Sequence, residues 1–383
     1  MKLVATTFTS NAASIIRDAI KSVVSWVDVC LIIDTGVTDA TLEIARRAAG
    51  DKYVARTFRW RNDFSAARNF ALDTARKLGG DWAVTVDTDE RLDLMGQNIR
   101  AVLASATEEM LMMSSKDGSY VKERFFRLPM PVRWSGPTHE SFPSSKVKRR
   151  VLGKGFFREL PKSATALRRK FERDAAVLEA YTRKHPFNPR WHFYLGESYK
   201  YLGRDADAIA AYNACAALRG WDEESAWACY RAAECHVALG AFQEAIDRCA
   251  AGLARHAGTA ELAWLAAFSA YHLGQHAQAV YWALLSSAVG CFRGVGATMP
   301  RIGFRNLNAL YEGPFDVLRL AYKALDNRAK AEEAQRLYHE AIRARRKASR
   351  DGVVPGQVTA VVGGELVSMP SKRTPRSQRR PAR

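Results

Sequence analysis

The residues best suited to chemistry are three acids that follow a short apolar run. Residues 81–90 read Asp-Trp-Ala-Val-Thr-Val-Asp-Thr-Asp-Glu, so a strand-like segment ends on Asp87, Asp89 and Glu90. In open α/β sheets, ligands bind beyond the carboxyl ends of the strands, which is where these acids fall. Asp87 and Asp89 can converge on one hard cation, Mg²⁺ or Mn²⁺, that keeps positions open for phosphate oxygens. The spacing therefore predicts a metal-diphosphate site, and the alternative is a solvated acidic turn.

Strands that alternate with helices must position these acids. Strands are predicted at 2–8, 29–34 and 53–58, because each segment is a short run rich in apolar and β-branched residues. Helices are predicted at 13–25, after Thr38 or Asp39, and after Asp63 or Ser65, which can cap them. The alternation predicts a parallel sheet with right-handed crossovers.

Three ordered motifs make residues 1–140 resemble the family 2 glycosyltransferases. They are Asp-Thr-Gly-x-Thr-Asp-x-Thr at 34–41, Asp-Phe-Ser-Ala-Ala-Arg-Asn at 63–69, and Asp-Trp at 81–82 leading to Asp-x-Asp-Glu at 87–90. The resemblance implies a GT-A fold, which is a Rossmann-like α/β domain that binds a nucleotide-diphosphate sugar. It also implies that Asp34 contacts the base or ribose, that Asp87 contacts the ribose or diphosphate, and that Asp89 holds the Mn²⁺ or Mg²⁺ ion with Asp87 beside it.

The remaining motif residues complete the expected donor-binding set. Asp39 and Arg68 belong to it by the same resemblance. For Arg68 and Asn69 a structural role is weighed equally with donor binding. In that role they tie their helix to the donor-site loop. Val37 and Ala40 stand where the family commonly has Ser and Gly, which leaves the identity of the donor open.

An acceptor side is expected at residues 133–140, which read Arg-Trp-Ser-Gly-Pro-Thr-His-Glu. This stretch resembles the subgroup of peptide S-glycosyltransferases, in which a Trp/Gly segment ends in His-Glu. Direct, inverting displacement at an anomeric carbon needs a group that takes the acceptor's proton. We expect Glu140 to be that base and His139 to orient it or contact the diphosphate. His139 could instead be a second metal ligand or a structural hydrogen-bonding group, and Trp134 either stacks on a sugar or fills the core.

The second half of the chain carries a repeat of helix pairs. Gly240 and Gly274 are 34 residues apart, the period of a tetratricopeptide repeat, and small residues recur at that repeat's offsets. Gly203 precedes Gly240 by 37 residues because residues 219–222 lengthen a loop. Stacked helix pairs of this kind form a solenoid with one continuous core, which predicts a surface for a protein or peptide acceptor or for a homodimer.

Four parts of the chain follow from these patterns. They are a GT-A glycosyltransferase domain at 1–160, tetratricopeptide-like repeats at 165–290, capping helices at 291–349, and a basic tail at 350–383 that is expected to be disordered. Residues 341–383 hold eleven Lys and Arg against two acids, so this end carries half of the net charge of +18. The rest of the chain is only moderately basic, and nucleic acid is not the expected partner.

Composition also bears on where the protein works. The six cysteines form no Cys-x-x-Cys pair, which favours a reduced, cytoplasmic setting. The sequence begins without the basic and apolar regions of an export signal, and no run of eighteen uncharged apolar residues occurs, so no membrane span is expected.

Two other functions compete with a metal-dependent glycosyltransferase. A non-catalytic binding scaffold with a degenerate front domain is favoured by Val37, but the intact acids and His139-Glu140 speak against it. A nucleotidyltransferase would need a Gly-rich, basic phosphate loop after the first strand, and residues 6–11 read Thr-Thr-Phe-Thr-Ser-Asn.

Overall fold

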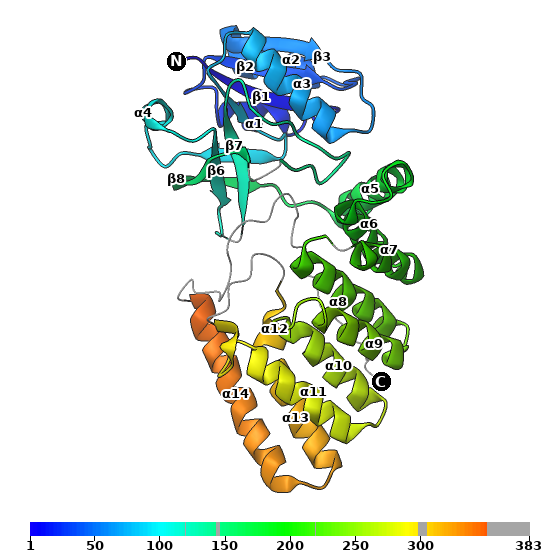
Figure 1. Ribbon diagram of the computed structural model, residues 1–383. Helices are drawn as coiled ribbons and strands as arrows, with labels where there is room; N and C mark the ends of the chain where they lie inside the picture. The colour runs from blue at the N-terminus through cyan, green and yellow to red at the C-terminus, as the bar shows by residue number, and fades with distance from the viewer. Residues whose placement is uncertain (119, 143–145, 219, 298–304, 351–383) are drawn as a thin grey trace, which may run out of the picture.

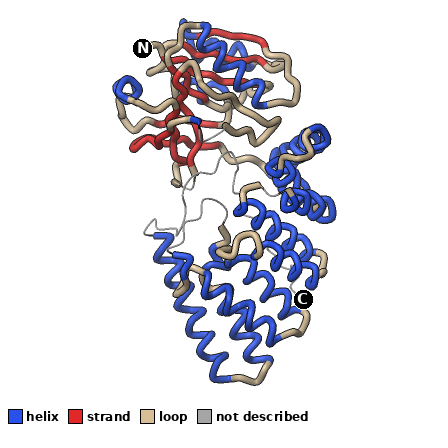
Figure 2. The backbone as a smooth tube through the Cα atoms, viewed as in Figure 1, coloured by secondary structure: helices blue, strands red, loops and turns tan. Residues whose placement is uncertain are grey.

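The protein consists of a mixed β-sheet with its flanking helices, followed by an array of helices (Figure 1). A computed structural model describes residues 1–118, 120–142, 146–218, 220–297 and 305–350. Strands gather in one half of the molecule and the long helices in the other (Figure 2). The basic tail predicted to be disordered lies outside the described residues.

The eight strands form one sheet in the order β3-β2-β1-β4-β7-β6-β8-β5. The first four strands in the chain are parallel to their neighbours, as predicted, so their carboxyl ends meet at one edge. β7 joins β4 in the antiparallel direction and makes the sheet mixed. The strands are β1 (Leu3–Thr9), β2 (Val29–Asp34), β3 (Tyr53–Thr57), β4 (Trp82–Thr85), β5 (Glu90–Asp93), β6 (Met110–Ser115), β7 (Val121–Arg127) and β8 (Arg149–Glu159).

Helices cover both faces of the sheet, because its buried strands present apolar side chains on each side. Leu3 and Ala5 of β1 pack in one core cluster, whereas Val4 between them packs in the other. The first cluster is closed by α1 (Ile16–Lys21), α2 (Thr41–Ala49) and α4 (Ile99–Ser105), and the second by α3 (Phe64–Lys77).

Two local predictions differ from the structure. The helix expected at 13–25 is regular only over α1, Ile16–Lys21, and the chain turns on both sides of it. Ile15 at its start offers no side-chain cap, and the Ser22 hydroxyl donates to the Ala19 carbonyl oxygen at its end. Ala40 rather than Thr38 or Asp39 precedes α2, although Asp39 accepts a hydrogen bond from the Thr41 N–H of the first turn.

The second half is helical throughout the part that the structure describes. Its helices are α5 (Ala164–Lys184), α6 (Pro189–Tyr201), α7 (Asp205–Ala217), α8 (Asp222–Ala238), α9 (Phe242–Leu253), α10 (Ala260–His272), α11 (His276–Val289), α12 (Leu307–Leu310), α13 (Gly313–Ala324) and α14 (Arg328–Arg350). Gly203, Gly240 and Gly274, the glycines that mark the predicted repeat period, join α6 to α7, α8 to α9, and α10 to α11 with φ near +75°. Glycine adopts this left-handed conformation without steric cost, so each helix pair turns tightly.

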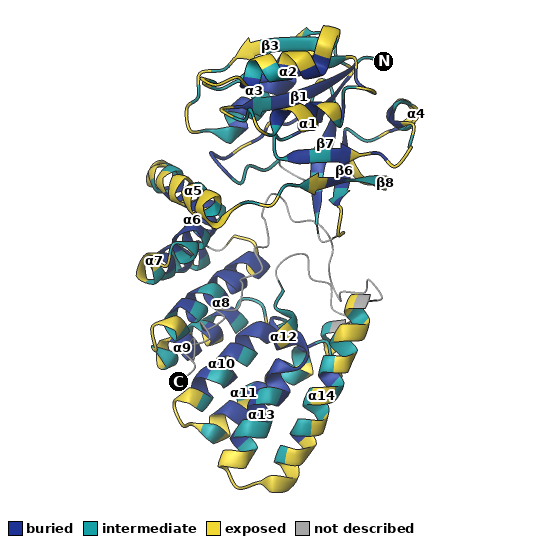
Figure 3. Ribbon diagram, turned by 180° about the vertical axis from the view of Figure 1, so that it is seen from behind, coloured by how far each residue is buried: buried dark blue, intermediate teal, exposed yellow. Residues whose placement is uncertain are grey.

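The helices form one continuous hydrophobic core, as expected of a solenoid. Figure 3 shows buried residues along α8 and α10, whereas α5 and α14 expose much of their surface. Arg305 and Asn306 lie against α8 and α10: the Asn306 side chain donates to the Tyr230 hydroxyl at 2.8 Å, and its N–H donates to Glu261 at 3.2 Å. The chain itself therefore covers this part of the solenoid.

None of the described helices combines the length and apolar character needed to cross a bilayer. Cys30, Cys215, Cys229, Cys235 and Cys249 are buried and form no disulfide, and Cys291 is partly exposed.

Candidate functional site

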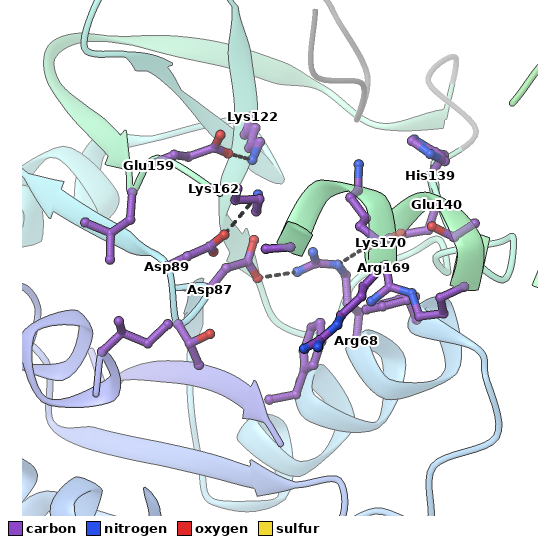
Figure 4. A pocket seen from close by; sticks show the side chains of 18 of the residues that line it. Arg68, Asp87, Asp89, Lys122, His139, Glu140, Glu159, Lys162, Arg169 and Lys170 are labelled. Atoms are coloured by element: carbon purple, nitrogen blue, oxygen red, sulfur yellow. Dashed lines mark hydrogen bonds and ion pairs between the residues drawn. The ribbon is translucent and has the colours of Figure 1, made fainter. Parts of the chain in front are cut away.

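A cavity of about 860 Å³ opens at the carboxyl edge of the parallel strands (Figure 4). Its lining comes from three places: the sheet and α3, the segment 134–140, and the segment 159–173 that enters α5. Seven basic and five acidic side chains line it. They are Arg68, Lys122, Arg124, Lys162, Arg169, Lys170 and Arg173, and Asp87, Asp89, Glu123, Glu140 and Glu159. A polar cavity with excess positive charge suits an anionic ligand.

Asp87 and Asp89 lie beyond the end of β4, and both line this cavity. Asp87 contacts two guanidinium groups, of Arg68 at 3.4 Å and of Arg124 at 3.9 Å. Burial alone would raise the pKa of Asp87, but these cations hold it below the usual range. Asp89 pairs with the Lys162 ammonium group at 3.1 Å. Asp87 is therefore a fixed anion, whereas Asp89 faces a single flexible cation.

The two acids can hold a divalent cation only with help from a ligand. Among the described residues, no three His, Cys, Asp or Glu side chains form a complete metal site. Mg²⁺ and Mn²⁺ are commonly held by one or two carboxylates, with the other positions taken by phosphate oxygens and water. Asp89, with Asp87 beside it, fits that type of site.

Arg68 links the metal-side acids to the predicted acceptor side. It extends from α3, whose first turn is capped by Asp63 accepting from the Ala66 N–H at 2.9 Å. Its guanidinium group contacts Asp87 and donates to Glu140. Burial alone would lower the pKa of Arg68, but the two carboxylates raise it well above the usual value. Arg68 is thus a permanent cation that fixes both acids.

Asn69 makes a structural contact, but with the segment predicted as the acceptor side and not with the donor-site loop. Its side chain donates to the Trp134 carbonyl oxygen at 2.9 Å and accepts from the Trp134 N–H at 3.0 Å. These two bonds tie α3 to the segment that carries His139 and Glu140. The Trp134 ring is buried against Phe126 and Phe142 and also lines the cavity.

His139 and Glu140 both line the cavity, but they point to different partners. The His139 ring stacks on Tyr194 of α6 with centroids 4.0 Å apart, and its Nε2 lies 3.8 Å from Asp174 of α5. Its φ of +50° belongs to the left-handed region, which turns the chain here. Glu140 instead accepts from Arg68 inside the sheet domain.

Asp34 and Asp39 do not line the cavity. One carboxylate oxygen of Asp34 accepts from the N–H groups of Gly36 and Val37, each at 2.8 Å. Asp39 accepts from the Thr41 and Ala13 N–H groups at 2.9 and 3.3 Å. In this structure both acids therefore shape the turn that follows β2.

Several lining residues were not among those predicted from the sequence. Glu123 of β7 is buried, and burial raises the pKa of its carboxyl group. Lys122 and Arg124 beside it contact Glu90, whose pKa is raised first by burial and also by Asp87. The consecutive charges Lys-Glu-Arg in a strand that ends Phe-Phe were the available signal, because a buried strand rarely carries them without a polar site.

Comparisons with known proteins agree with the motifs. Residues 6–173 match the family model "Glycosyl transferase family 2". This part of the chain is therefore a family 2 glycosyltransferase domain, and its fold confirms the predicted α/β class.

Two curated relatives match the chain over different lengths. The SPbeta prophage-derived glycosyltransferase SunS of Bacillus subtilis is 25% identical over 216 residues, which are 52% of this chain and 49% of the relative. The chain thus spans about half the length of that protein. A TPR repeat-containing protein of Synechococcus elongatus is 40% identical over 84 residues, 22% of this chain and 19% of the relative.

Solved structures match the helical half at low similarity. The crystal structure of MamA gives a TM-score of 0.37 at 17% identity and covers 50% of this chain and 99% of that chain. The structure of YrrB, described as a TPR protein with an unusual peptide-binding site, gives 0.35 at 12% identity, covering 48% and 84%.

Proposed function

We propose that the protein transfers a sugar from a nucleotide-diphosphate sugar to an acceptor. The observation that carries this proposal is the cavity of the family 2 domain, where Asp87 and Asp89 lie at the carboxyl edge of parallel strands among an excess of basic side chains. A nucleotide-diphosphate sugar brings negative charge at its centre and an electrophilic anomeric carbon at one end, which such a site accommodates.

Mn²⁺ or Mg²⁺ is part of the proposed donor site. Asp89 and Asp87 would hold the ion, since among the described residues the cation paired with Asp89 is the Lys162 ammonium group. When bound, the ion would neutralise charge on the leaving diphosphate. Lys162 must then leave Asp89, and a phosphate oxygen is a suitable new partner for its ammonium group.

The proposed reaction inverts the anomeric carbon. The acceptor's nucleophilic atom forms a bond to that carbon as the bond to the diphosphate oxygen breaks, and a carboxylate takes the acceptor's proton. We assign this base to Glu140, which Arg68 holds in the cavity, and a positioning role to His139. Glu123 is the second candidate, because its buried carboxyl has a raised pKa and opens on the same cavity.

The proposed acceptor is a protein or peptide. The helical half supports this because solenoids of helix pairs commonly bind extended chains. A relative named for its TPR repeats is similar to 84 residues of this chain. The surface of α8 and α10 near Tyr230 is already covered by Asn306, so a bound chain would use another part of the solenoid. The buried thiols of Cys30, Cys215, Cys229, Cys235 and Cys249, which form no disulfide, support a reduced, cytoplasmic location.

A thermal-shift screen tests the proposal directly. UDP-, GDP- and dTDP-sugars are added with and without Mn²⁺ to the parent protein and to Asp89→Ala. One nucleotide class should raise the melting temperature of the parent in a metal-dependent manner, and the variant should lose this shift, because a ligand stabilises only the state that binds it.

The same preparations distinguish an enzyme from a scaffold. Release of nucleoside diphosphate from the stabilising donor, with water as acceptor, should fall at least about 100-fold in Asp89→Ala. A folded parent protein that no donor stabilises would instead favour the non-catalytic binding scaffold. Turnover in Asp89→Ala equal to that of the parent would refute the role given to the metal.

A further inference from the structure

The first helix of the helical half forms one side of the cavity. The lining residues of α5 are Ala166, Arg169, Lys170 and Arg173. Their spacing of three, four and seven residues places them on one face of the helix. Three of the four are basic, and Figure 4 shows Arg169 and Lys170 on the helix at this side of the site.

Arg169 differs in its partners from the two nearest arginines of this helix, Arg168 and Arg173. Arg173 contacts Asp174 at 2.7 Å and lies over the Phe64 ring. Arg168 points away from the cavity, is 67% exposed, and pairs with Glu172 one turn later. Arg169 lines the cavity, and no carboxylate in the described part of the chain pairs with it. A guanidinium group in this position is available to an anionic ligand.

Buried contacts hold α5 against the catalytic domain. Asp174 of α5 is fully buried, accepts from the Thr138 hydroxyl at 3.5 Å, and has His139 3.8 Å away. Arg190 of α6 donates to the His139 carbonyl oxygen at 3.2 Å. The position of Arg169 and Lys170 relative to Asp87 and Asp89 is therefore fixed by packing and not by a free linker.

The backbone of the same segment also meets α6 closely. Gly136 has a φ of +102°, and a Cβ atom added there would lie 2.1 Å from the Trp191 ring. Only glycine allows this approach, so the segment that carries His139 and Glu140 is shaped by the helical half as well as by α3.

We propose that Arg169 and Lys170 bind the diphosphate of the donor, so that α5, the helix in which the family-matched segment 6–173 ends, supplies one side of the donor site. This inference rests on the proposed function. The sheet contributes the acids that would hold the metal, and α5 contributes cations that can contact phosphate oxygens on the other side. Guanidinium groups bind phosphate through two parallel N–H donors, and ammonium groups act as point charges.

Binding of nucleoside diphosphates tests the proposal without any acceptor. The probes are UDP, GDP and dTDP with Mn²⁺, measured by calorimetry on the full chain. For the nucleotide that binds the parent, the double variant Arg169→Ala/Lys170→Ala should bind at least about 10-fold more weakly, because it loses two charge-assisted contacts. Arg168→Ala is the matched control and should bind within about 2-fold of the parent, because its side chain is a solvent-exposed ion-pair partner.

Two further variants separate a lost contact from a lost fold. Arg169→Lys/Lys170→Arg keeps the charges and should recover most of the affinity, and Arg169→Gln/Lys170→Gln keeps the side-chain bulk and should not. Melting temperatures without ligand should agree among the variants.

The outcomes also separate this inference from the proposed function. A parent protein that binds no nucleoside diphosphate contradicts the proposed function, and this inference falls with it. A parent that binds in a metal-dependent way, with the double variant equal to Arg168→Ala, overturns only the inference. The inference alone is also overturned if the double variant binds nucleoside diphosphate as the parent does and lowers only the apparent affinity for an acceptor. Arg169 and Lys170 would then bind the acceptor.

Discussion

Two buried clusters of charge occupy the two halves of the molecule. The site cluster consists of Arg68, Asp87, Glu90, Lys122, Arg124 and Glu140. The helix cluster consists of Glu197, Lys200, Arg231 and Glu234, with the Tyr212 hydroxyl donating to Glu197. Both contain carboxylates that arginine guanidinium groups contact, but only the site cluster opens on the cavity.

The carboxyl groups of the two clusters differ in the direction of their pKa shifts. In the helix cluster, burial alone would raise the pKa of Glu197 and Glu234, but Arg231 lowers both overall. In the site cluster the pKa of Asp87 is lowered while that of Glu90 is raised. A cluster that only stabilises can satisfy every charge. A site that must accept a ligand keeps groups whose charge is not fully compensated, which is typical of functional sites.

Removal of Arg231 should give the largest effect and should act on stability alone. Arg231 donates to both oxygens of Glu197, at 2.7 and 2.9 Å, and to Glu234 at 2.8 Å. Arg231→Met leaves two partly buried carboxylates without this partner, which should lower the free energy of unfolding by about 3 kcal/mol. Urea denaturation of the full chain measures this value.

The control is an arginine of the same half that lies at the surface. Arg204 pairs with Asp207 at 2.7 Å and is 47% exposed, so Arg204→Met should cost less than about 1 kcal/mol. Nucleoside diphosphate affinity, measured where Arg231→Met remains folded, should equal that of the parent. Equal stability losses in the two variants would mean that the helix cluster is not a buried network.

Glu140→Gln should give the next largest effect and should act on turnover alone. If Glu140 takes the acceptor's proton, the amide cannot replace it, and turnover should fall at least about 100-fold, or about 2.7 kcal/mol. Donor affinity should change little, since the amide oxygen can still accept from Arg68. Single-turnover kinetics with the donor identified by the thermal-shift screen measures the chemical step.

Glu123→Gln provides the comparison within the same cavity. We expect Glu140→Gln to lose more turnover than Glu123→Gln. The reverse order would assign the base to the carboxyl with the raised pKa and leave Glu140 as the partner that fixes Arg68.

The sheet half was the more predictable of the two, because its site follows from strand ends and motifs. Arg68, Glu140 and the neighbouring pair Asp87 and Asp89 come from three parts of the chain, and all four line one cavity. The rule that parallel strands end at one edge, together with the family motifs, was sufficient for that. Asp34 obeys the same rule but turns its carboxylate to its own loop, which no pattern in the sequence indicates.

The contributions of the helical half could not be predicted from local patterns. His139 stacks on Tyr194, which lies 55 residues later in the chain, and Arg169 reaches the cavity only because α5 packs against residues 136–139. The sequence predicts the helix and its basic residues, but it does not show which face of α5 meets another domain. Solenoid turns were predictable because each needs a glycine with positive φ.

The pH dependence of stability should separate Glu123, which lies next to the site cluster in β7, from Glu197 of the helix cluster, with the smallest effect, on the order of 1 kcal/mol for each variant. Glu123 holds its proton more tightly in the folded state, so ionisation costs folding free energy above about pH 4.3. Glu123→Gln should therefore gain stability over the parent as the pH rises to 7.

The pKa of Glu197 is lowered by folding, so its ionised form stabilises the protein above about pH 4.3. Glu197→Gln should be less stable at pH 7, and its deficit should fade as the pH falls below 4.3. Thermal unfolding between pH 3.5 and 7 gives both slopes, and slopes of the same sign would remove the distinction between the clusters.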